Sequence, residues 1–303
     1  MKKIIPLLIL LVFPLISAQN VFKSQKQIYL AQYYAHLKND KKALDCYLKA
    51  IDFNSKINSY DYLSAASIAF KLDKKNTAKN LLIKSITKQQ APLDFIKEYK
   101  SLKPYQDSKE MKEVLDQYND FENQYFRELK NPKAYMEIQN LIAKDQLIRE
   151  EENTFLKLSD KVDSVNITKL KELTIKYGWE PRAWVLLWHH RDSYNENNFV
   201  WNFFKPFLQK EIEKDNVNKD FFVDFEEFDN STSNLQAPAI YELGGIGTLS
   251  MNQTYDDIKN LDKRRKSLGL PPLYFEYFLN NNSELPEGYK YNPENLLKDL
   301  ENL

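Results

Sequence analysis

The chain has almost no cysteine and very little glycine. Cys46 is the only cysteine among 303 residues, so no internal disulfide can form and a packed core must supply the stability. Three histidines and one cysteine, without zinc-type spacing, argue against a metal site. Six glycines beside 19 tyrosines and 18 phenylalanines favour long helices with aromatic packing over a turn-rich β fold. The composition therefore predicts a mainly α fold.

The chain also lacks an excess of charge of either sign. Lysine and arginine number 43, and aspartate and glutamate number 43. Binding to nucleic acid or to an anionic membrane depends on an excess of positive charge, so we expect neither as a partner.

The only glycine cluster is Gly244-Gly245-Ile246-Gly247-Thr248. It is not a phosphate loop, because no Lys-Ser or Lys-Thr follows it. We expect a tight turn beside a short strand, so the second domain would carry a minor β component. Its free backbone amides could still line a small anionic site. No motif predicts a cofactor.

The first 18 residues have the pattern of a secretory signal. Lys2 and Lys3 precede an apolar run over residues 4–16, and the small Ser17 and Ala18 follow. The run is shorter than the roughly 20 residues of a membrane-spanning helix. We predict cleavage after Ala18, export to the periplasm or the medium, and no transmembrane segment in the mature chain. The alternative is an uncleaved membrane anchor.

An internal repeat covers residues 24–90. An offset of 35 residues aligns Ala31 with Ala66, Leu37 with Leu72, Ala43 with Ala78, Lys49 with Lys84 and Ile51 with Ile86. Each copy has the pattern of a helix, a polar turn and a second helix. The region resembles the tetratricopeptide repeat, whose period is about 34 residues. This resemblance implies a concave surface for a protein or peptide partner; the alternative is a helical spacer.

Two repeats do not bury a continuous core, because about three are needed. We therefore expect residues 91–130 to add capping helices. The predicted organisation is a signal peptide over residues 1–18, tetratricopeptide-like helical hairpins over 19–130, and a mostly helical second domain over 131–303.

Polar residues fall on apolar faces of the predicted helices in the second domain. Asp145 and Arg149 are four residues apart and continue the apolar stripe of a helix that begins near Ala134. Gln146 lies beside them. Unpaired charge is costly inside a protein, so this pair is either a structural ion pair or part of a polar pocket.

Further candidates follow along the chain. Asn166 is placed to cap the next helix, which Gly178 should end. His190 shares a predicted face with apolar residues, whereas His189 points elsewhere, and histidine titrates nearest neutral pH. Arg265, next to Arg264, falls on the inner face of a later helix. Each has a structural interpretation and a functional one.

Several short pieces occur in a fixed order: Asp145-Gln146-Leu147-Ile148-Arg149, Asp163-Ser164-Val165-Asn166, Tyr177-Gly178-Trp179, Ala183-Trp184 with His190 and Asp192, Gly247-Thr248, and Arg264-Arg265 with Leu268-Gly269-Leu270. Their order and spacing over residues 134–272 resemble a bacterial domain family of unknown function, often found behind repeats in exported proteins. The chain departs from the family pattern at Ile246 and Leu249, where tyrosine and glutamine are usual. The resemblance implies boundaries and fold more than an activity.

We expect a protein-interaction or structural protein of the bacterial cell envelope that binds a partner through its repeats and is not an enzyme. The alternative is a hydrolytic enzyme whose catalytic residues are His190, Asp145 and Arg149, with histidine as the acid or base and arginine stabilising an anion. Its binding residues would be Gln146, Asn166, Asp192, Thr248, Arg264 and Arg265.

Overall fold

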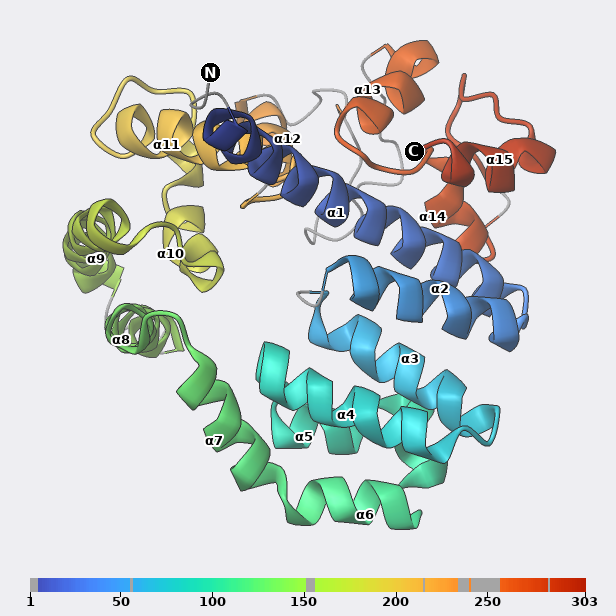
Figure 1. Ribbon diagram of the computed structural model, residues 1–303. Coiled ribbons are helices and arrows are strands. Elements are labelled where there is room, and N and C mark those ends of the chain that lie inside the picture. The colour runs from blue at the N-terminus through green and yellow to red at the C-terminus, as the bar shows by residue number, and fades with distance from the viewer. Residues whose placement is uncertain are drawn as a thin grey trace. The chain divides into compact units, whose positions relative to one another are not determined.

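The computed structural model describes residues 5–54, 57–150, 156–214, 216–233, 240, 257–282 and 284–303. For residues 5–20, 150, 156–157 and 229–233 it describes the backbone only. The described residues form helices and no strand, so the predicted mainly α fold is confirmed (Figure 1). The glycine cluster and its predicted short strand, including Thr248, Ile246 and Leu249, lie outside the described residues.

The chain divides into two compact units. The first contains residues 1–128, 265–285 and 289–303, and the second contains residues 129–264 and 286–288. Within the described parts of the chain, no helix has the length and apolarity that crossing a membrane requires.

Two consecutive helical hairpins begin the first unit. Their helices are α1 (Ile5–His36), α2 (Asp40–Phe53), α3 (Ser59–Lys71) and α4 (Lys75–Gln89). Figure 1 shows them stacked in chain order, with each helix packed on the next. The small residues of both copies are fully buried: Ala31, Ala43, Ala50, Ala66, Ala78 and Ser85. The predicted cleavage site after Ala18 lies within α1.

The turns inside the two hairpins have the same backbone structure. Lys38 and Asp73 adopt left-handed conformations, with φ of 58° and 56°. The next amide in each copy bonds a carbonyl five residues earlier: Asn39 N to Tyr34 O at 2.8 Å, and Lys74 N to Ala69 O at 2.8 Å. These bonds form the Schellman ending of a helix. Each pair of equivalent residues is 35 apart, which is the offset that the sequence predicts.

The remaining helices of the first unit extend and cover this stack. They are α5 (Leu93–Glu98), the 3-10 helix η1 (Lys100–Tyr105), α6 (Lys109–Asp116), α7 (Tyr118–Glu128), α14 (Tyr274–Leu279), η5 (Pro293–Asn295) and α15 (Leu296–Glu301). α6 and α7 pack on α4, whereas α14 and α15 pack on α1. From the sequence we assigned this tail to the second domain. The first unit includes it because Phe275, Leu296 and Leu300 are buried in the core of the hairpins.

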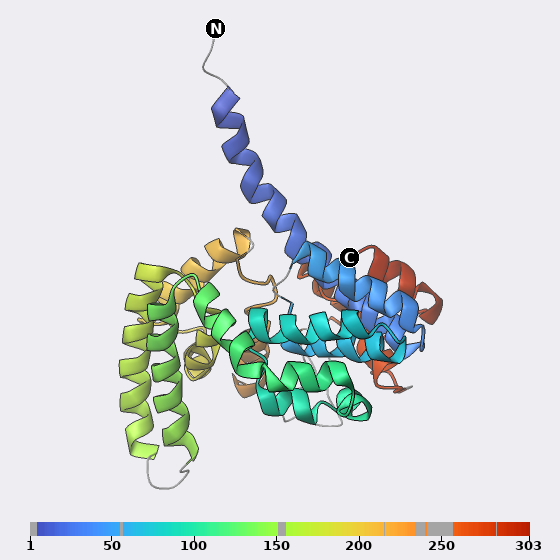
Figure 2. The same cartoon turned by 60° about the horizontal axis from the view of Figure 1, so that its bottom comes forward.

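The second unit contains a long helical pair and several short helices. They are α8 (Pro132–Glu150), α9 (Leu156–Tyr177), η2 (Pro181–Ala183), α10 (Trp184–Trp188), η3 (Arg191–Ser193), α11 (Trp201–Glu213), α12 (Val223–Ser233) and η4 (Ile258–Asn260). α13 (Leu261–Ser267) crosses the division between the units. Figure 2 shows α8 and α9 side by side. Leu170, Leu187, Phe204, Leu208 and Phe225 are fully buried in the core of this unit.

Asn166 does not cap a helix, so that prediction was wrong. α9 begins at Leu156, and Asn166 lies in its middle, 3% exposed. Its Nδ2 donates to the carbonyl oxygen of Leu141 in α8, at 3.3 Å. Tertiary packing therefore outweighs the capping preference of asparagine. The end of α9 is as predicted: Gly178 has φ 88°, and its amide bonds the carbonyl of Thr174 at 2.9 Å.

Candidate functional site

A charged cluster in the second unit joins α8 to α9. Asp145 is 2% exposed and accepts two hydrogen bonds from Arg149, at 3.1 Å from Nη2 and 3.4 Å from Nε. The two residues share one face of α8, as their spacing predicts. Arg149 Nη2 also donates to Asp163 Oδ1 of α9 at 2.6 Å. Gln146 Nε2 donates to Asp145 Oδ2 at 2.7 Å.

The partners of Asp145 keep it ionised. Burial alone would raise its pKa, because a charged group loses hydration inside the protein. The contacts with His189 and Arg149 outweigh that effect and lower the pKa of Asp145 to about 2. The carboxylate is therefore charged at neutral pH and satisfied by several donors.

His189, rather than His190, contacts Asp145. Its Nε2 lies 3.0 Å from Asp145 Oδ2, a contact of ion-pair length without the alignment of a hydrogen bond. We expected His190, and not His189, to share the inner face of a continuous helix, but α10 ends at Trp188 and the Nε2 atoms of both histidines are buried. Instead, the amide of His190 bonds the carbonyl of Leu187 at 3.0 Å, in a tighter turn.

His190 lies near the same charges. Burial lowers its pKa, while Asp163 opposes that effect and His189 and Arg149 add to it. A lowered pKa keeps the imidazole neutral at physiological pH. Its Nε2 is buried without a hydrogen-bond partner among the described residues. The structure therefore brings together Asp145, Gln146, Arg149 and His190, and adds Asp163 and His189.

The other predicted site residues lie elsewhere. Asp192 is exposed on η3, and Asn166 joins α8 to α9 as described above. Arg264 donates to the carbonyl oxygens of Ile240 and Asp257, at 3.1 and 3.2 Å. Arg265 belongs to the first unit, where it is fully buried. There it donates to the carbonyl of Pro271 at 2.8 Å and pairs with Glu276.

The charged cluster has the chemistry of a structural network. Arg149 is bound by two carboxylates, so it is poorly placed to stabilise a substrate anion. Within this cluster, His189 and Asp145 bring an imidazole and a carboxylate within 3.0 Å, and these are the two groups that acid–base catalysis would use. In the described parts of the chain, no group of three or more histidine, cysteine, aspartate or glutamate side chains is arranged to hold a metal ion.

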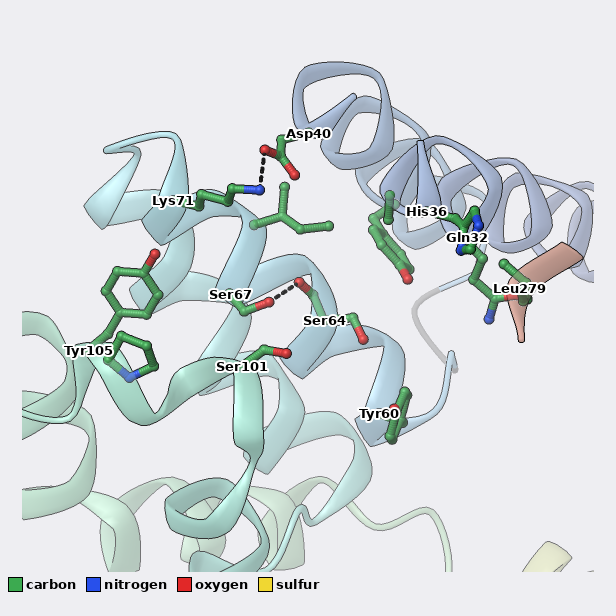
Figure 3. A pocket seen from close by; sticks show the side chains of 14 residues that line it. Gln32, His36, Asp40, Tyr60, Ser64, Ser67, Lys71, Ser101, Tyr105 and Leu279 are labelled. Carbon is green, nitrogen blue, oxygen red and sulfur yellow. Dashed lines mark hydrogen bonds and ion pairs between the residues drawn. The ribbon is translucent and has the colours of Figure 1, made fainter. Parts of the chain in front are cut away.

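A groove in the first unit offers a different kind of site. It has a volume of about 500 Å³ and is lined mainly by α1, α3 and η1 (Figure 3). The polar side chains of the lining include Gln32 and His36 of α1, Ser67 and Lys71 of α3, and Ser101 and Tyr105 of η1. Volumes of about 300–1,000 Å³ are typical of ligand pockets.

Hydroxyl groups dominate the polar lining of this groove. Ser64 Oγ and Tyr99 Oη lie 2.7 Å apart, and Ser67 Oγ donates to the carbonyl of Ser64 at 2.8 Å. Tyr47, which also lines the groove, is only 3% exposed. Tyr60, at the rim, is 58% exposed. The groove therefore combines uncharged donors and acceptors with aromatic rings.

A buried carboxyl group adjoins these hydroxyls. Asp61 is 4% exposed in the first turn of α3, where its amide donates to Asn58 Oδ1 at 2.8 Å. Burial raises the pKa of Asp61 to about 7, although its side-chain contact with Asn58 opposes the change. Burial raises the pKa of Tyr47, and the nearby Asp61 adds to this change.

We did not predict the groove residues from the sequence, although the repeat contains a signal for them. Gln32 and His36 in the first copy align with Ser67 and Lys71 in the second, at the same offset of 35 residues. These four side chains occupy equivalent positions on the first helix of each hairpin. Equivalent polar positions on successive hairpins were the sequence feature that could have predicted the groove.

Comparisons of the chain with models of protein families, with curated proteins and with solved structures gave no match.

Proposed function

We propose that this protein is an exported, non-enzymatic binding protein whose helical hairpins hold a segment of a protein partner in the groove of Figure 3. The observation that carries the proposal is the lining by equivalent positions of two successive hairpins. Stacked helical hairpins build extended concave surfaces, and here the first helix of each hairpin contributes side chains to the lining. The signal-like residues 1–18 support export to the cell envelope or beyond.

Site-specific photo-crosslinking tests the binding proposal. A photoreactive amino acid is placed at Ser101, in the groove, or at Lys103, which is exposed on the same 3-10 helix but does not line the groove. Irradiation of cells that make the protein should link a partner to the first position and not to the second. Equal products at both positions, or none at either, would refute binding in the groove.

Export has its own test. The proposal expects the mature chain to begin at Gln19 and to be found in the envelope fraction or the medium. Amino-terminal sequencing of the protein from each cell fraction measures both. An uncut chain that stays in the cytoplasmic fraction would contradict export.

The contact between His189 and Asp145 favours a second candidate, a hydrolytic enzyme. A carboxylate within 3.0 Å of an imidazole supplies the two groups of a general base, and a small rotation of the ring would align their hydrogen bond. The purified protein would then hydrolyse a chromogenic ester, amide, phosphate or glycoside, and His189→Asn would abolish the activity without changing the fold. Absence of activity on all four substrate classes would count against the enzyme.

A further inference from the structure

The charged groups of the groove are already engaged within the protein. Asp40 and Lys71 form an ion pair at 2.7 Å. The ring of His36 packs on Phe278, with centroids 4.3 Å apart. Every other side chain that lines the groove is uncharged. A charged ligand group would therefore lose hydration on entry without gaining a free partner of opposite charge among the side chains that line the groove.

The uncharged lining offers both donors and acceptors. Hydroxyl groups can act as either, and the bond between Ser64 and Tyr99 can run in both directions. Ser67 donates to a backbone carbonyl, so its oxygen keeps its acceptor capacity for a ligand. The side chains of Gln32 and Ser101 have no hydrogen-bond partner among the described residues, and both line the groove.

The rings of Tyr47, Tyr60 and Tyr105 all line the groove, and neighbouring rings hold the last two in place. Tyr60 is 58% exposed, and its ring meets the ring of Tyr99 edge-on, with centroids 5.2 Å apart. Tyr105 is held by stacking on Phe70, at 4.8 Å. Such rings supply contact area at a low cost in conformational entropy, because each has only two rotatable side-chain angles.

These features together point to a specific class of ligand. Resting on the function proposed above, we infer that the groove selects an extended, uncharged peptide segment of a partner protein. An extended backbone presents N–H and C=O groups that need partners, whereas the backbone of a helix has already paired them. The mixed donors and acceptors of the groove match such a backbone, and its rings match uncharged side chains.

The experiment begins with displayed random peptides that are selected on the purified protein. An enriched peptide is then made with a fluorescent label, and its dissociation constant is measured by anisotropy. The enriched peptides should lack charged residues at their central positions. Replacing one central residue by lysine or by glutamate should weaken binding about ten-fold or more, because the new charge is desolvated without a partner.

Matched variants of the protein locate the peptide. Tyr60→Ala should weaken binding about ten-fold, since it removes an exposed aromatic wall of the groove. Phe95→Ala is the control: Phe95 is 36% exposed and also meets Tyr99 edge-on, at 6.0 Å, but it does not line the groove. Ser101→Glu should weaken binding of the uncharged peptide and strengthen binding of its lysine-substituted form. Ser164→Glu replaces an exposed helical serine of the second unit and should leave the affinity for both peptides unchanged.

The outcomes separate the two proposals. If the enriched peptides share a charged residue and Tyr60→Ala still weakens their binding, the selectivity for uncharged segments would be overturned. Binding in the groove would then remain supported. Failure to enrich any peptide, or equal effects of Tyr60→Ala and Phe95→Ala, would overturn both. Binding of a neutral glycan that Tyr60→Ala abolishes, without any peptide binding, would also overturn both.

Discussion

Replacing Asp61 by asparagine should stabilise the first unit above neutral pH and leave its stability unchanged in acid. Asp61 is 4% exposed, and burial raises the pKa of its carboxyl group to about 7 from an ordinary value of 3.8. Asparagine has nearly the same shape as the protonated acid but cannot ionise. The substitution therefore isolates the free energy of burying the charge.

The sign follows from the two pKa values. Between about pH 4 and pH 7 the unfolded chain loses the proton of Asp61 first, so the stability of the folded state falls as the pH rises. Below that range Asp61 is protonated in both the folded and the unfolded state, and its charge does not lower the stability. Above that range the folded state bears the full free-energy cost of the buried charge, which is about 4 kcal/mol for the difference between the two pKa values. Part of this cost is offset by the amino-terminal end of α3, which favours a negative charge.

Urea unfolding at about pH 4 and about pH 8 measures the effect. Far-UV circular dichroism follows both units, whereas tryptophan fluorescence follows the second unit only, because all four tryptophans lie there: Trp179, Trp184, Trp188 and Trp201. We expect Asp61→Asn to raise the dichroism midpoint at the higher pH alone. An equal change at both pH values, or destabilisation at the higher one, would refute the reasoning.

Two further predictions concern the second unit and the helix ends. Asp145→Asn should destabilise the second unit by about 2 kcal/mol near neutral pH, since contacts with ionised Asp145 hold its pKa at about 2. The stability difference between this variant and the natural sequence should vanish as the pH falls from about 4 towards 2. Tryptophan fluorescence in urea measures it, and a difference that persists at low pH would contradict the prediction. Gly178→Ala should lower the free energy of unfolding by about 1–2 kcal/mol, because φ is 88° and alanine is strained in this conformation. The loss should be no larger, since an added Cβ meets nothing within 4 Å. Gly269→Ala should lower the stability more than Gly178→Ala, because the added Cβ would lie 2.7 Å from the ring of Phe22. Thermal unfolding measures both losses. Equal losses would contradict the prediction and would show that the ring of Phe22 moves away at little cost.

Local sequence patterns predicted the features that depend on near neighbours. The offset of 35 residues predicted two equivalent hairpins, and Lys38 and Asp73 end their helices in the same left-handed turn. The four-residue spacing of Asp145 and Arg149 predicted their shared face, because the helical period fixes which side chains lie together. Gly178 ends its helix for another local reason, because glycine adopts the left-handed conformation without a steric penalty.

Only the tertiary structure decided which distant segments meet. The helical period could not orient His189, because α10 ends one residue earlier. Asn166 lies within α9, where its side chain donates a hydrogen bond to a backbone carbonyl of α8. The tail joined the first unit because Phe275 completes the core of the hairpins. The groove needs side chains from helices far apart in the chain. Packing of apolar surface selects such contacts without regard to separation along the sequence, so a local pattern does not contain them.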